Sequence, residues 1–496
     1  MRAAVAFAVT SWFTPVFAVG VHAFGASFAL SLLIGLALAA SVAALTASPL
    51  ADLLRALRAA PALLALTAIL AVAAIVQIAK ISVYMADPSR TDCSFSTEPW
   101  RVQHSCMTAY AEAIRFARAG DTNIYDVSLY EPRFVGPLKV DSYHYPPVFL
   151  LLPAAVHALR ADLFGMRAIW FVLQCVALAA AIFGLARWVG GRPGACAAVG
   201  GVFALATPQI VYSLQQGNVQ STAIPLAAIA FVLILRGRFA AGAPLLAYTA
   251  AAKIFPAALV LYLLGARRWR ALAWVAGSGV LLVALTVAVV GTRPLRDFVQ
   301  YEIPRISNGD AFPQAERADT TKVNLSVYGL TTRTRQLGAT FLDRRRGLAI
   351  ASGYGLLIIA LAVLAGWKQR LDLADPLQRL RLVQLSIGLL ALASFRSPFV
   401  GFYGFVAPVW LMSLLAAESQ QSSAIIVSWI GIAVFGIGHL LVPAPGTPST
   451  PLALAGSGLL FAIALAVSVA AVLRAMRTSP RTVVPARTGD GVARVE

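Results

Sequence analysis

The most informative part of the sequence is residues 236–270, which read RGRFAAGAPLLAYTAAAKIFPAALVLYLLGARRWR. An apolar run, 240–265, lies between two groups of arginines, and Lys253 and Pro256 stand near its middle. A membrane span needs about 20 mostly apolar residues, so this run is too long for one straight span. The run therefore predicts either a hairpin of two half-helices or one strongly kinked helix.

The rest of the chain has the same apolar character. Of its 496 residues 59% are hydrophobic and only 12% are charged, whereas soluble domains have about 45–50% apolar and about 25% charged residues. This composition excludes a soluble globular enzyme, a disordered chain and a disulfide-dense small protein. Further spans are predicted at 3–22, 26–47, 61–84, 166–187, 194–213, 221–236, 272–291, 347–366, 381–395, 399–416, 424–441 and 452–473. The expected fold is an all-α polytopic membrane protein with about 12 transmembrane helices plus the half-helix hairpin.

The positions of the basic residues predict the orientation of the chain. The formal net charge is +19, and most bases occupy short loops between spans, so we interpret the surplus as topological and expect no nucleic acid partner. One side of the membrane receives Arg55, Arg58, Arg187, Arg192, Arg236, Arg238, Arg267, Arg268, Arg270, Lys368 to Arg381 and the tail from Arg474. Basic loops face the cytoplasm, so both termini are expected inside and the polar stretches 85–145 and 292–346 outside. The triplet Arg344–Arg346 departs from this rule.

The first outer stretch carries the polar cysteines and many of the acids. Cys93 and Cys106 are separated by 12 residues and predict a small disulfide, which an oxidising compartment permits. Asp87 and Asp92 stand at the membrane boundary, where a partly desolvated carboxylate has a raised pKa and can act as a base. For any single acid, a solvated loop charge is the simpler interpretation. The sequence has no zinc spacing, Walker loop, dinucleotide fingerprint or nucleophile elbow, so no metal or nucleotide site is predicted.

Several short motifs, taken in order, resemble glycosyltransferase family 87. They are Tyr110-Ala-Glu-Ala-Ile-Arg-Phe-Ala-Arg-Ala-Gly120 with Ile124-Tyr-Asp126, Tyr143-His-Tyr-Pro-Pro147 before an apolar run, Gln216-Gly-Asn218, Lys253 in a hairpin closed by Arg267-Arg-Trp-Arg270, and Asn324-Leu-Ser-Val-Tyr-Gly-Leu330. The resemblance implies a GT-C membrane fold and transfer of a sugar, usually mannose and in related members arabinose, from a polyprenyl-phosphate donor to an acceptor hydroxyl on the outer face. It also implies an aspartate base in the first outer loop.

The sequence departs from the family at two places. Where the family carries its loop aspartate, just ahead of the tyrosine segment, this chain reads His104-Ser-Cys106. A Cys93–Cys106 disulfide would bring Asp92 to that place, so Asp92 is the first candidate base and Asp87 the second, with His104 and Glu112 in reserve. The second departure is Ser397-Pro-Phe-Val-Gly-Phe-Tyr403, where the family often has Trp and paired His. It leaves the acceptor and the sugar open.

Four basic residues are candidates for the donor phosphate. Lys253 is the one base inside its apolar run, where an unpaired ammonium costs a few kcal/mol, so a functional partner is the default expectation. A structural ion pair or snorkelling to the interface is the alternative. Arg333, Arg335 and Arg396 are expected near the outer face, and a guanidinium binds phosphate through paired hydrogen bonds. Contact with lipid headgroups or plain solvation would explain these arginines equally well.

Four further residues are candidates for contact with the sugar or the acceptor. Gln216 and Asn218 flank Gly217 between two spans, and their amides either bind sugar hydroxyls or cap a helix end. Tyr145 can stack on a sugar, although an interfacial aromatic anchor is the simpler interpretation. Asn324 either binds sugar or caps the short helix after it.

These features divide the chain into a two-span extension (1–60), a GT-C-like catalytic domain (61–473) and a cytoplasmic tail (474–496). The predicted function is a hexosyltransferase of a bacterial cell membrane, with a polyprenyl-phosphate-linked sugar, a lipid or glycan acceptor and membrane lipid as partners. No cofactor is specified, and a divalent cation stays open. The alternatives are a transporter or flippase of a lipid-linked substrate and a non-catalytic membrane scaffold.

Overall fold

The structure is a computed structural model that describes residues 1–57, 60–87, 103–120, 122–368, 373–419 and 449–477. Within these ranges the chain is helical almost throughout, and the short strands β1 (Phe134–Val135) and β2 (Leu138–Lys139) form one antiparallel ribbon. Eight described helices are long and apolar enough to cross a membrane, and a ninth span results if one bent helix pair is counted. The expected all-α polytopic membrane protein is confirmed.

Most predicted spans correspond to one helix each. They are α1 (Arg2–His22), α2 (Phe28–Leu54), α3 (Pro61–Ala86), α7 (Leu163–Val189), α10 (Gln220–Leu235), α13 (Trp269–Val290), α17 (Arg344–Lys368), α18 (Pro376–Ser394), α19 (Val406–Ser419) and α21 (Pro451–Arg477). The predicted span 424–441 and most of the predicted tail lie outside the described residues. The division into extension, catalytic domain and tail stays a prediction.

Two predicted spans are broken. The run 240–265 forms α11 (Phe239–Lys253) and α12 (Ala257–Gly265), which confirms an interrupted helix, and Ile254 between them has a φ of 61°. The run 194–213 was expected as one span and instead forms α8 (Gly191–Leu205) and α9 (Pro208–Gln216), bent by 60°. The bend has a local cause. Pro208 disfavours helical backbone at Thr207, which is extended at φ −79° and ψ 143°.

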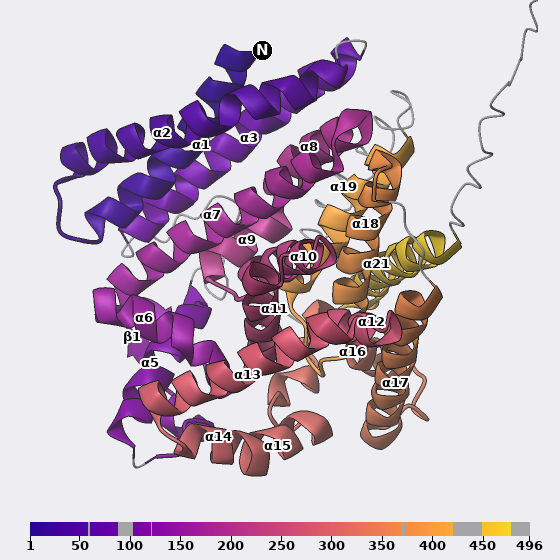
Figure 1. Cartoon of the computed structure of the whole chain (residues 1–496). Coiled ribbons are helices and arrows are strands. Elements are labelled where there is room, and N and C mark those ends of the chain that lie inside the picture. The colour runs from indigo at the N-terminus through magenta and orange to yellow at the C-terminus, as the bar shows by residue number, and fades with distance from the viewer. Residues whose placement is uncertain (58–59, 88–102, 121, 369–372, 420–448, 478–496) are drawn as a thin grey trace, which may run out of the picture.

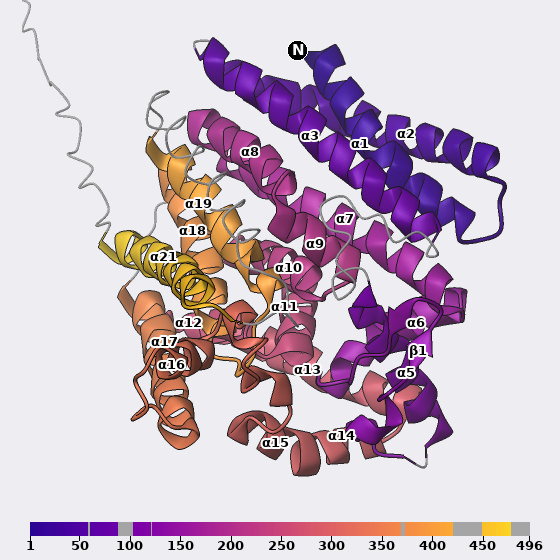
Figure 2. The same cartoon turned by 180° about the vertical axis from the view of Figure 1, so that it is seen from behind.

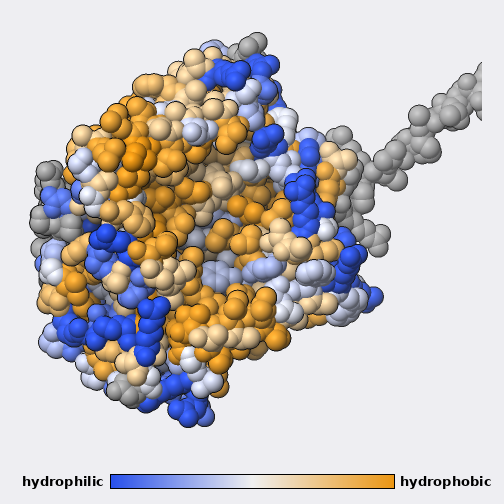
Figure 3. Space-filling view, turned by 60° about the vertical axis from the view of Figure 1, so that its left-hand side comes forward, coloured by the Kyte–Doolittle hydropathy of each residue, from blue (hydrophilic) through white to orange (hydrophobic). Residues whose placement is uncertain are grey.

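The helices form a bundle (Figures 1 and 2). α10, α18 and α19 are buried over most of their length, whereas α13 and α17 expose leucine and valine side chains on one side. The short elements α5 (Cys106–Ala119), α6 (Leu151–Leu159), α14 (Arg293–Asp297), α15 (Ile303–Asn308) and α16 (Val327–Gln336) belong to the loop face, which we define as residues 103–145 and 292–343 with the helix ends they touch. Broad apolar surfaces cover the molecule in Figure 3, and the face seen there is hollowed at its centre.

The contact between α12 and α17 depends on two glycines. A Cβ added to Gly366 would clash with the carbonyl oxygen of Tyr262, and one added to Gly265 would clash with that of Val363. Since both clashes involve backbone atoms, no side chain can move aside to relieve them. The two helices can approach this closely only because both positions are glycine.

We expect Gly366→Leu to destabilise the protein by about 1–3 kcal/mol or more, because overpacking against backbone forces the helices apart. The measurement is thermal unfolding of the detergent-purified protein. Gly353→Leu is the matched control on the same helix, since no atom lies within 4 Å of a Cβ there. Equal melting temperatures for the two variants would contradict the proposed close contact.

Candidate active site

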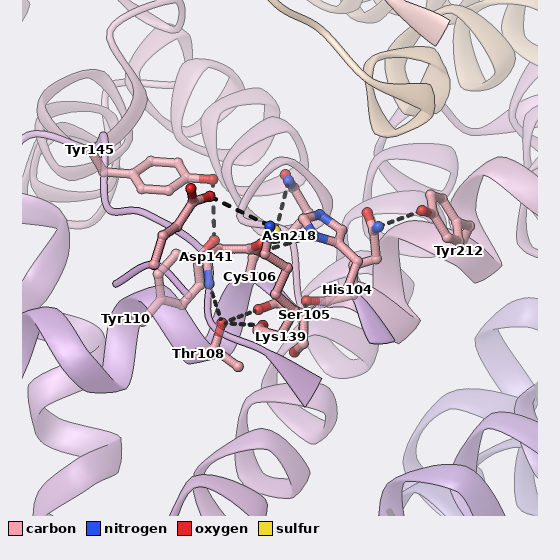
Figure 4. Close-up of polar contacts among 12 residues, drawn as sticks. His104, Ser105, Cys106, Thr108, Tyr110, Lys139, Asp141, Tyr145, Tyr212 and Asn218 are labelled. Carbon is pink, nitrogen blue, oxygen red and sulfur yellow. Dashed lines mark hydrogen bonds and ion pairs between the residues drawn. The ribbon is translucent and has the colours of Figure 1, made fainter. Parts of the chain in front are cut away.

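The first part of the site is built where β2 meets the N-terminal end of α5. His104 forms an isolated parallel bridge with Lys139. Thr108 Oγ1 donates to the Ser105 carbonyl oxygen at 2.8 Å and accepts from the Asp141 backbone N–H at 3.0 Å. These bonds hold two segments that are distant in sequence side by side (Figure 4). The side chains of His104 and Asp141 are thereby brought together.

His104 and Asp141 form an ion pair on the loop face. His104 Nδ1 lies 3.0 Å from the Asp141 carboxylate, and both side chains are less than a quarter exposed. Burial lowers the pKa of His104, but the negative charge of Asp141 and its hydrogen bond raise it more, to about 10. The imidazole is therefore protonated at neutral pH and stabilises the carboxylate as an anion. Both Asp141 carboxylate oxygens lie 3.0 Å from His104 Nδ1. Oδ2 accepts no hydrogen bond from any other described residue, so it keeps a lone pair for a substrate proton.

Cys106 and Asn218 close the other side of this pair. Asn218 Nδ2 donates to Cys106 Sγ at 3.4 Å, which joins α5 to the corner between α9 and α10. The potential ligand atoms of His104, Cys106 and Asp141 all lie within 4.8 Å of one another. Nitrogen, sulfur and carboxylate oxygen are a donor set that suits Zn²⁺, so a divalent cation could be held here, as the sequence left open.

The second part of the site lies at the break between α11 and α12. Lys253 is the last residue of α11, and its Nζ lies 4.4 Å from the centre of the Tyr145 ring and 5.9 Å from that of Tyr403. Lys253 makes no ion pair with any acid of the described ranges. Aromatic faces attract a cation without neutralising it. The ammonium thus keeps its full charge for a ligand.

Tyr145 also connects the two parts of the site. Its hydroxyl lies 3.4 Å from that of Tyr110, and Figure 4 shows Asp141 beside its ring. Burial raises the pKa of the Tyr145 phenol well above its usual value, so the ring stays neutral beside Lys253. Tyr125 donates from its hydroxyl to the Tyr145 carbonyl oxygen at 3.0 Å, and Tyr143 donates to that of Pro146 at 3.1 Å. The motif 143–147 is therefore fixed at both backbone and side chain.

A triad of His144, Glu302 and Arg305 ties the same motif to the second loop. His144 Nδ1 lies 2.8 Å from Oε1 of Glu302, and Arg305 Nη1 lies 2.9 Å from Oε2 of that residue. The Glu302 side chain is fully buried and ends a π-helical turn, Phe298–Glu302. Arg305 also donates to the Tyr125 carbonyl oxygen. Both loops are therefore held together around Tyr145.

Two of the predicted second-loop residues form a separate group. The Asn324 amide donates to the Pro398 carbonyl oxygen at 2.9 Å and accepts from the Val400 N–H at 3.1 Å. The Asn324 carbonyl oxygen accepts a hydrogen bond from Arg333, whose side chain is buried. This group braces the segment that leads to Tyr403. Asn324 thus contributes to the site through that segment, and both ends of its amide are already bonded within the protein.

The remaining predicted residues lie elsewhere on the loop face or outside the described ranges. Glu112 bonds Arg115 at 2.6 Å and Arg133 at 2.8 Å, and Arg335 bonds Glu316 at 2.6 Å. Asp87 follows the C-terminal end of α3, and half-buried Arg396 lies beside Gly355 of α17. Asp92 and Cys93 fall outside the described residues, so the Asp92 base and the Cys93–Cys106 disulfide stay predictions.

Of the predicted residues, the structure thus gathers His104, Tyr145, Gln216, Asn218 and Lys253 around one place. The sequence did not single out Asp141 or Tyr403. Asp141 carried one usable signal, since it stands two residues before the motif that begins at Tyr143. Its pairing with His104 spans 37 residues of chain and depends on the folded loop.

A bundle of membrane-length helices with a polar site at two helix breaks defines a polytopic membrane protein that acts on a ligand at its loop face. Comparison with known families matches residues 143–394 to glycosyltransferase family 87, and the chain belongs to that family. It is a membrane glycosyltransferase. The match contains Tyr145, Gln216, Asn218 and Lys253 and begins just after Asp141. No curated protein matches the chain.

Removing the Glu302 carboxylate from the triad tests how firmly the two loops are joined. We expect Glu302→Ala to lower the free energy of unfolding by about 3 kcal/mol, because it leaves the partly buried Arg305 and His144 without the buried acid that they share. Denaturant titration in detergent measures this change. Glu131→Ala is the control, since its 3.5 Å pair with Lys139 is about half exposed and should contribute at most about 1 kcal/mol. A loss no larger than that of the control would show that the triad does not join the loops.

Proposed function

We propose that this glycosyltransferase moves a hexose, with mannose as the first sugar to test, from a polyprenyl-phosphate donor to a hydroxyl of a lipid or glycan acceptor. The observation that carries the proposal is the Lys253 ammonium, which is unpaired among the described residues and lies at a helix break beside Tyr145. A half-buried cation with aromatic neighbours and no acid partner in the described ranges suits a ligand that brings its own negative charge. A phosphate attached to a membrane lipid supplies that charge at this depth.

The proposed chemistry uses the two parts of the site for two ends of one reaction. Asp141 Oδ2 takes the proton of the acceptor hydroxyl, and the acceptor oxygen forms a bond to the anomeric carbon of the sugar. The bond from that carbon to the phosphate oxygen breaks, and its electron pair leaves with the polyprenyl phosphate. Lys253 stabilises the negative charge that develops there. Since one base acts on one face, the anomeric configuration inverts.

The distribution of charge supports the orientation. The arginines at the ends of helices opposite the loop face include Arg187, Arg192 and Arg236, whereas the loop face carries the paired acids described above. Basic loops are retained in the cytoplasm. We therefore propose that the loop face is extracytoplasmic in a bacterial cell membrane and that both termini are cytoplasmic. Nucleotide sugars are absent from this side of the membrane, so a lipid-linked sugar is the suitable donor there.

The direct test is transfer of radiolabelled mannose from polyprenyl-phosphate mannose to lipid extracted from the producing cells. Membranes that contain the protein should form a labelled lipid or glycan, and membranes without it should not. Polyprenyl-phosphate arabinose and a nucleotide-linked mannose are tested in parallel. Transfer from the nucleotide sugar alone would overturn the proposed donor, and transfer of arabinose alone would overturn the proposed sugar.

The base assignment predicts the behaviour of Asp141→Asn. The amide keeps the size of the side chain but cannot accept the proton, so we expect transfer to fall by about 10²- to 10⁴-fold with normal expression. Asp310→Asn, which loses only an exposed contact to Arg344, serves as the control and should keep its activity. Undiminished transfer by Asp141→Asn would remove Asp141 as the base.

A chelator should leave transfer unchanged, and a loss that Zn²⁺ restores would instead make His104, Cys106 and Asp141 metal ligands.

The phosphate assignment predicts the behaviour of Lys253. Lys253→Met removes the charge that stabilises the leaving phosphate, and we expect kcat to fall by about 10²- to 10³-fold. Lys253→Arg should recover part of that loss because it restores a cation. Lys80→Met is the matched control, since Lys80 also lies on a membrane-length helix but is exposed. Equal losses in Lys253→Met and Lys253→Arg would indicate a structural role for Lys253.

A further inference from the structure

The corner between α9 and α10 is unusually polar for a buried part of a membrane protein. The stretch 209–222 reads QIVYSLQQGNVQST, and its polar side chains are almost completely buried. Near this corner, five buried oxygens have no hydrogen-bond partner among the described residues: Gln174 Oε1, Ser213 Oγ, Gln216 Oε1, Gln220 Oε1 and Thr222 Oγ1. Buried polar atoms are bonded in the great majority of cases. Such a group of exceptions indicates that a ligand or water completes it.

Three of these atoms are amide oxygens, which only accept hydrogen bonds, and the two hydroxyls can accept or donate. The amide nitrogen of Gln174 donates to the Asn218 carbonyl oxygen at 2.6 Å and to Ser221 Oγ at 2.5 Å. The amide nitrogen of Gln216 donates to the Tyr212 hydroxyl at 2.5 Å. In Gln174 and Gln216 the amide nitrogen is therefore used within the protein, and the amide oxygen is left for a partner. Carbonyl oxygens repel a phosphate and attract a hydroxyl hydrogen.

The corner adjoins the reacting groups. Ser105 Oγ donates to the Gln216 carbonyl oxygen at 3.5 Å, and Asn218 bonds Cys106 on the other side of the His104–Asp141 pair. Gly217, with a φ of 67°, turns the chain here, and a Cβ on it would lie 2.8 Å from Met107. The corner therefore packs against the N-terminal end of α5, next to the His104–Asp141 pair. A ring bound at the corner would present a carbon or a hydroxyl to Asp141.

We propose that the α9–α10 corner is a subsite that binds a pyranose ring through its hydroxyl groups. Each free acceptor oxygen would receive one hydroxyl hydrogen, and the serine and threonine hydroxyls can also donate. The ring belongs either to the donor sugar or to a sugar of the acceptor, and both have the same hydrogen-bonding chemistry. The choice between these two sources rests on the proposed function, whereas the binding of a polyol at this corner does not.

The kinetic test uses substitutions that keep shape and remove the acceptor. Gln220→Met and Thr222→Val each delete one hydrogen bond, so we expect the KM for one substrate to rise about five- to tenfold with a smaller change in kcat. Gln384→Met is the matched control. Gln384 on α18 is also fully buried, its Oε1 is also unbonded, and its nitrogen donates to the Leu414 carbonyl oxygen at 2.9 Å.

The substrate whose KM rises shows whether the bound pyranose belongs to the donor or to the acceptor. A rise confined to polyprenyl-phosphate mannose identifies the donor sugar, and a rise confined to the acceptor lipid identifies an acceptor sugar. Both results support the subsite. If Gln220→Met and Thr222→Val behave like Gln384→Met, or change only kcat, the subsite is wrong even where transfer itself is confirmed.

A binding measurement separates this proposal from the proposed donor. Trp170 donates from its indole nitrogen to the Gly217 carbonyl oxygen at 3.0 Å, so it reports on the corner. Methyl mannoside should change the tryptophan fluorescence of the purified protein, and this change should be lost in Trp170→Phe and weakened in Gln220→Met. The same signal without any transfer from polyprenyl phosphates would retain the subsite and reject the donor. A response to Na⁺ or K⁺ but to no sugar would overturn the subsite.

Discussion

The structure depends on one electrostatic constraint, which is the placement of the Lys253 ammonium at the end of an interrupted helix. A charge inside a membrane protein is stable only where protein groups or a ligand offset its lost hydration. Lys253 is given aromatic faces, Tyr145 and Tyr403, which attract it without cancelling its charge. Each of these rings is held by a different loop. Tyr125 fixes the backbone of Tyr145, and Asn324 fixes the segment that ends at Tyr403. The two loops therefore serve a common purpose, which is to hold rigid walls around one cation.

The helix breaks and the polar site have the same physical origin. Backbone amides inside a membrane must be bonded within the protein, so a helix can be interrupted only where protein or a polar ligand surrounds the interruption. Here α8 turns into α9 at Pro208, and α11 ends at Lys253. Intact helices such as α13 and α17 carry the apolar outer surface. Discontinuous helices commonly build substrate sites in membrane proteins for this reason. In this family 87 glycosyltransferase the first loop contacts the α9–α10 corner through Asn218 and the α11–α12 break through Lys253.

Much of the fold was predictable because it depends on local composition, whereas the site depends on contacts between distant segments. Apolar runs predicted the helices, and Lys253 with Pro256 predicted the break in 240–265. The bend at Pro208 was missed because that proline stands in a run of otherwise ordinary length. His104 was a reserve candidate for the base, but nothing in the sequence shows that the bridge to Lys139 brings Asp141 to it. Glu302 was likewise one acid among several, since only the folded loops reveal that it bonds His144 and Arg305.

The charges of the site account for why one aspartate is enough for the proposed transfer. Before the reaction Lys253 and protonated His104 are positive, and Asp141 and the phosphodiester of the donor are each negative, so the charges cancel. When Asp141 accepts the hydroxyl proton it becomes neutral, and the leaving phosphate monoester gains the negative charge that Asp141 gave up. The sum is again zero. A low-dielectric site strongly favours reactions that move charge within it over those that create charge. His104 matters to this balance because its positive charge would otherwise have to come from solvent or a metal ion. The amide oxygens of the α9–α10 corner are neutral, so they do not change the balance.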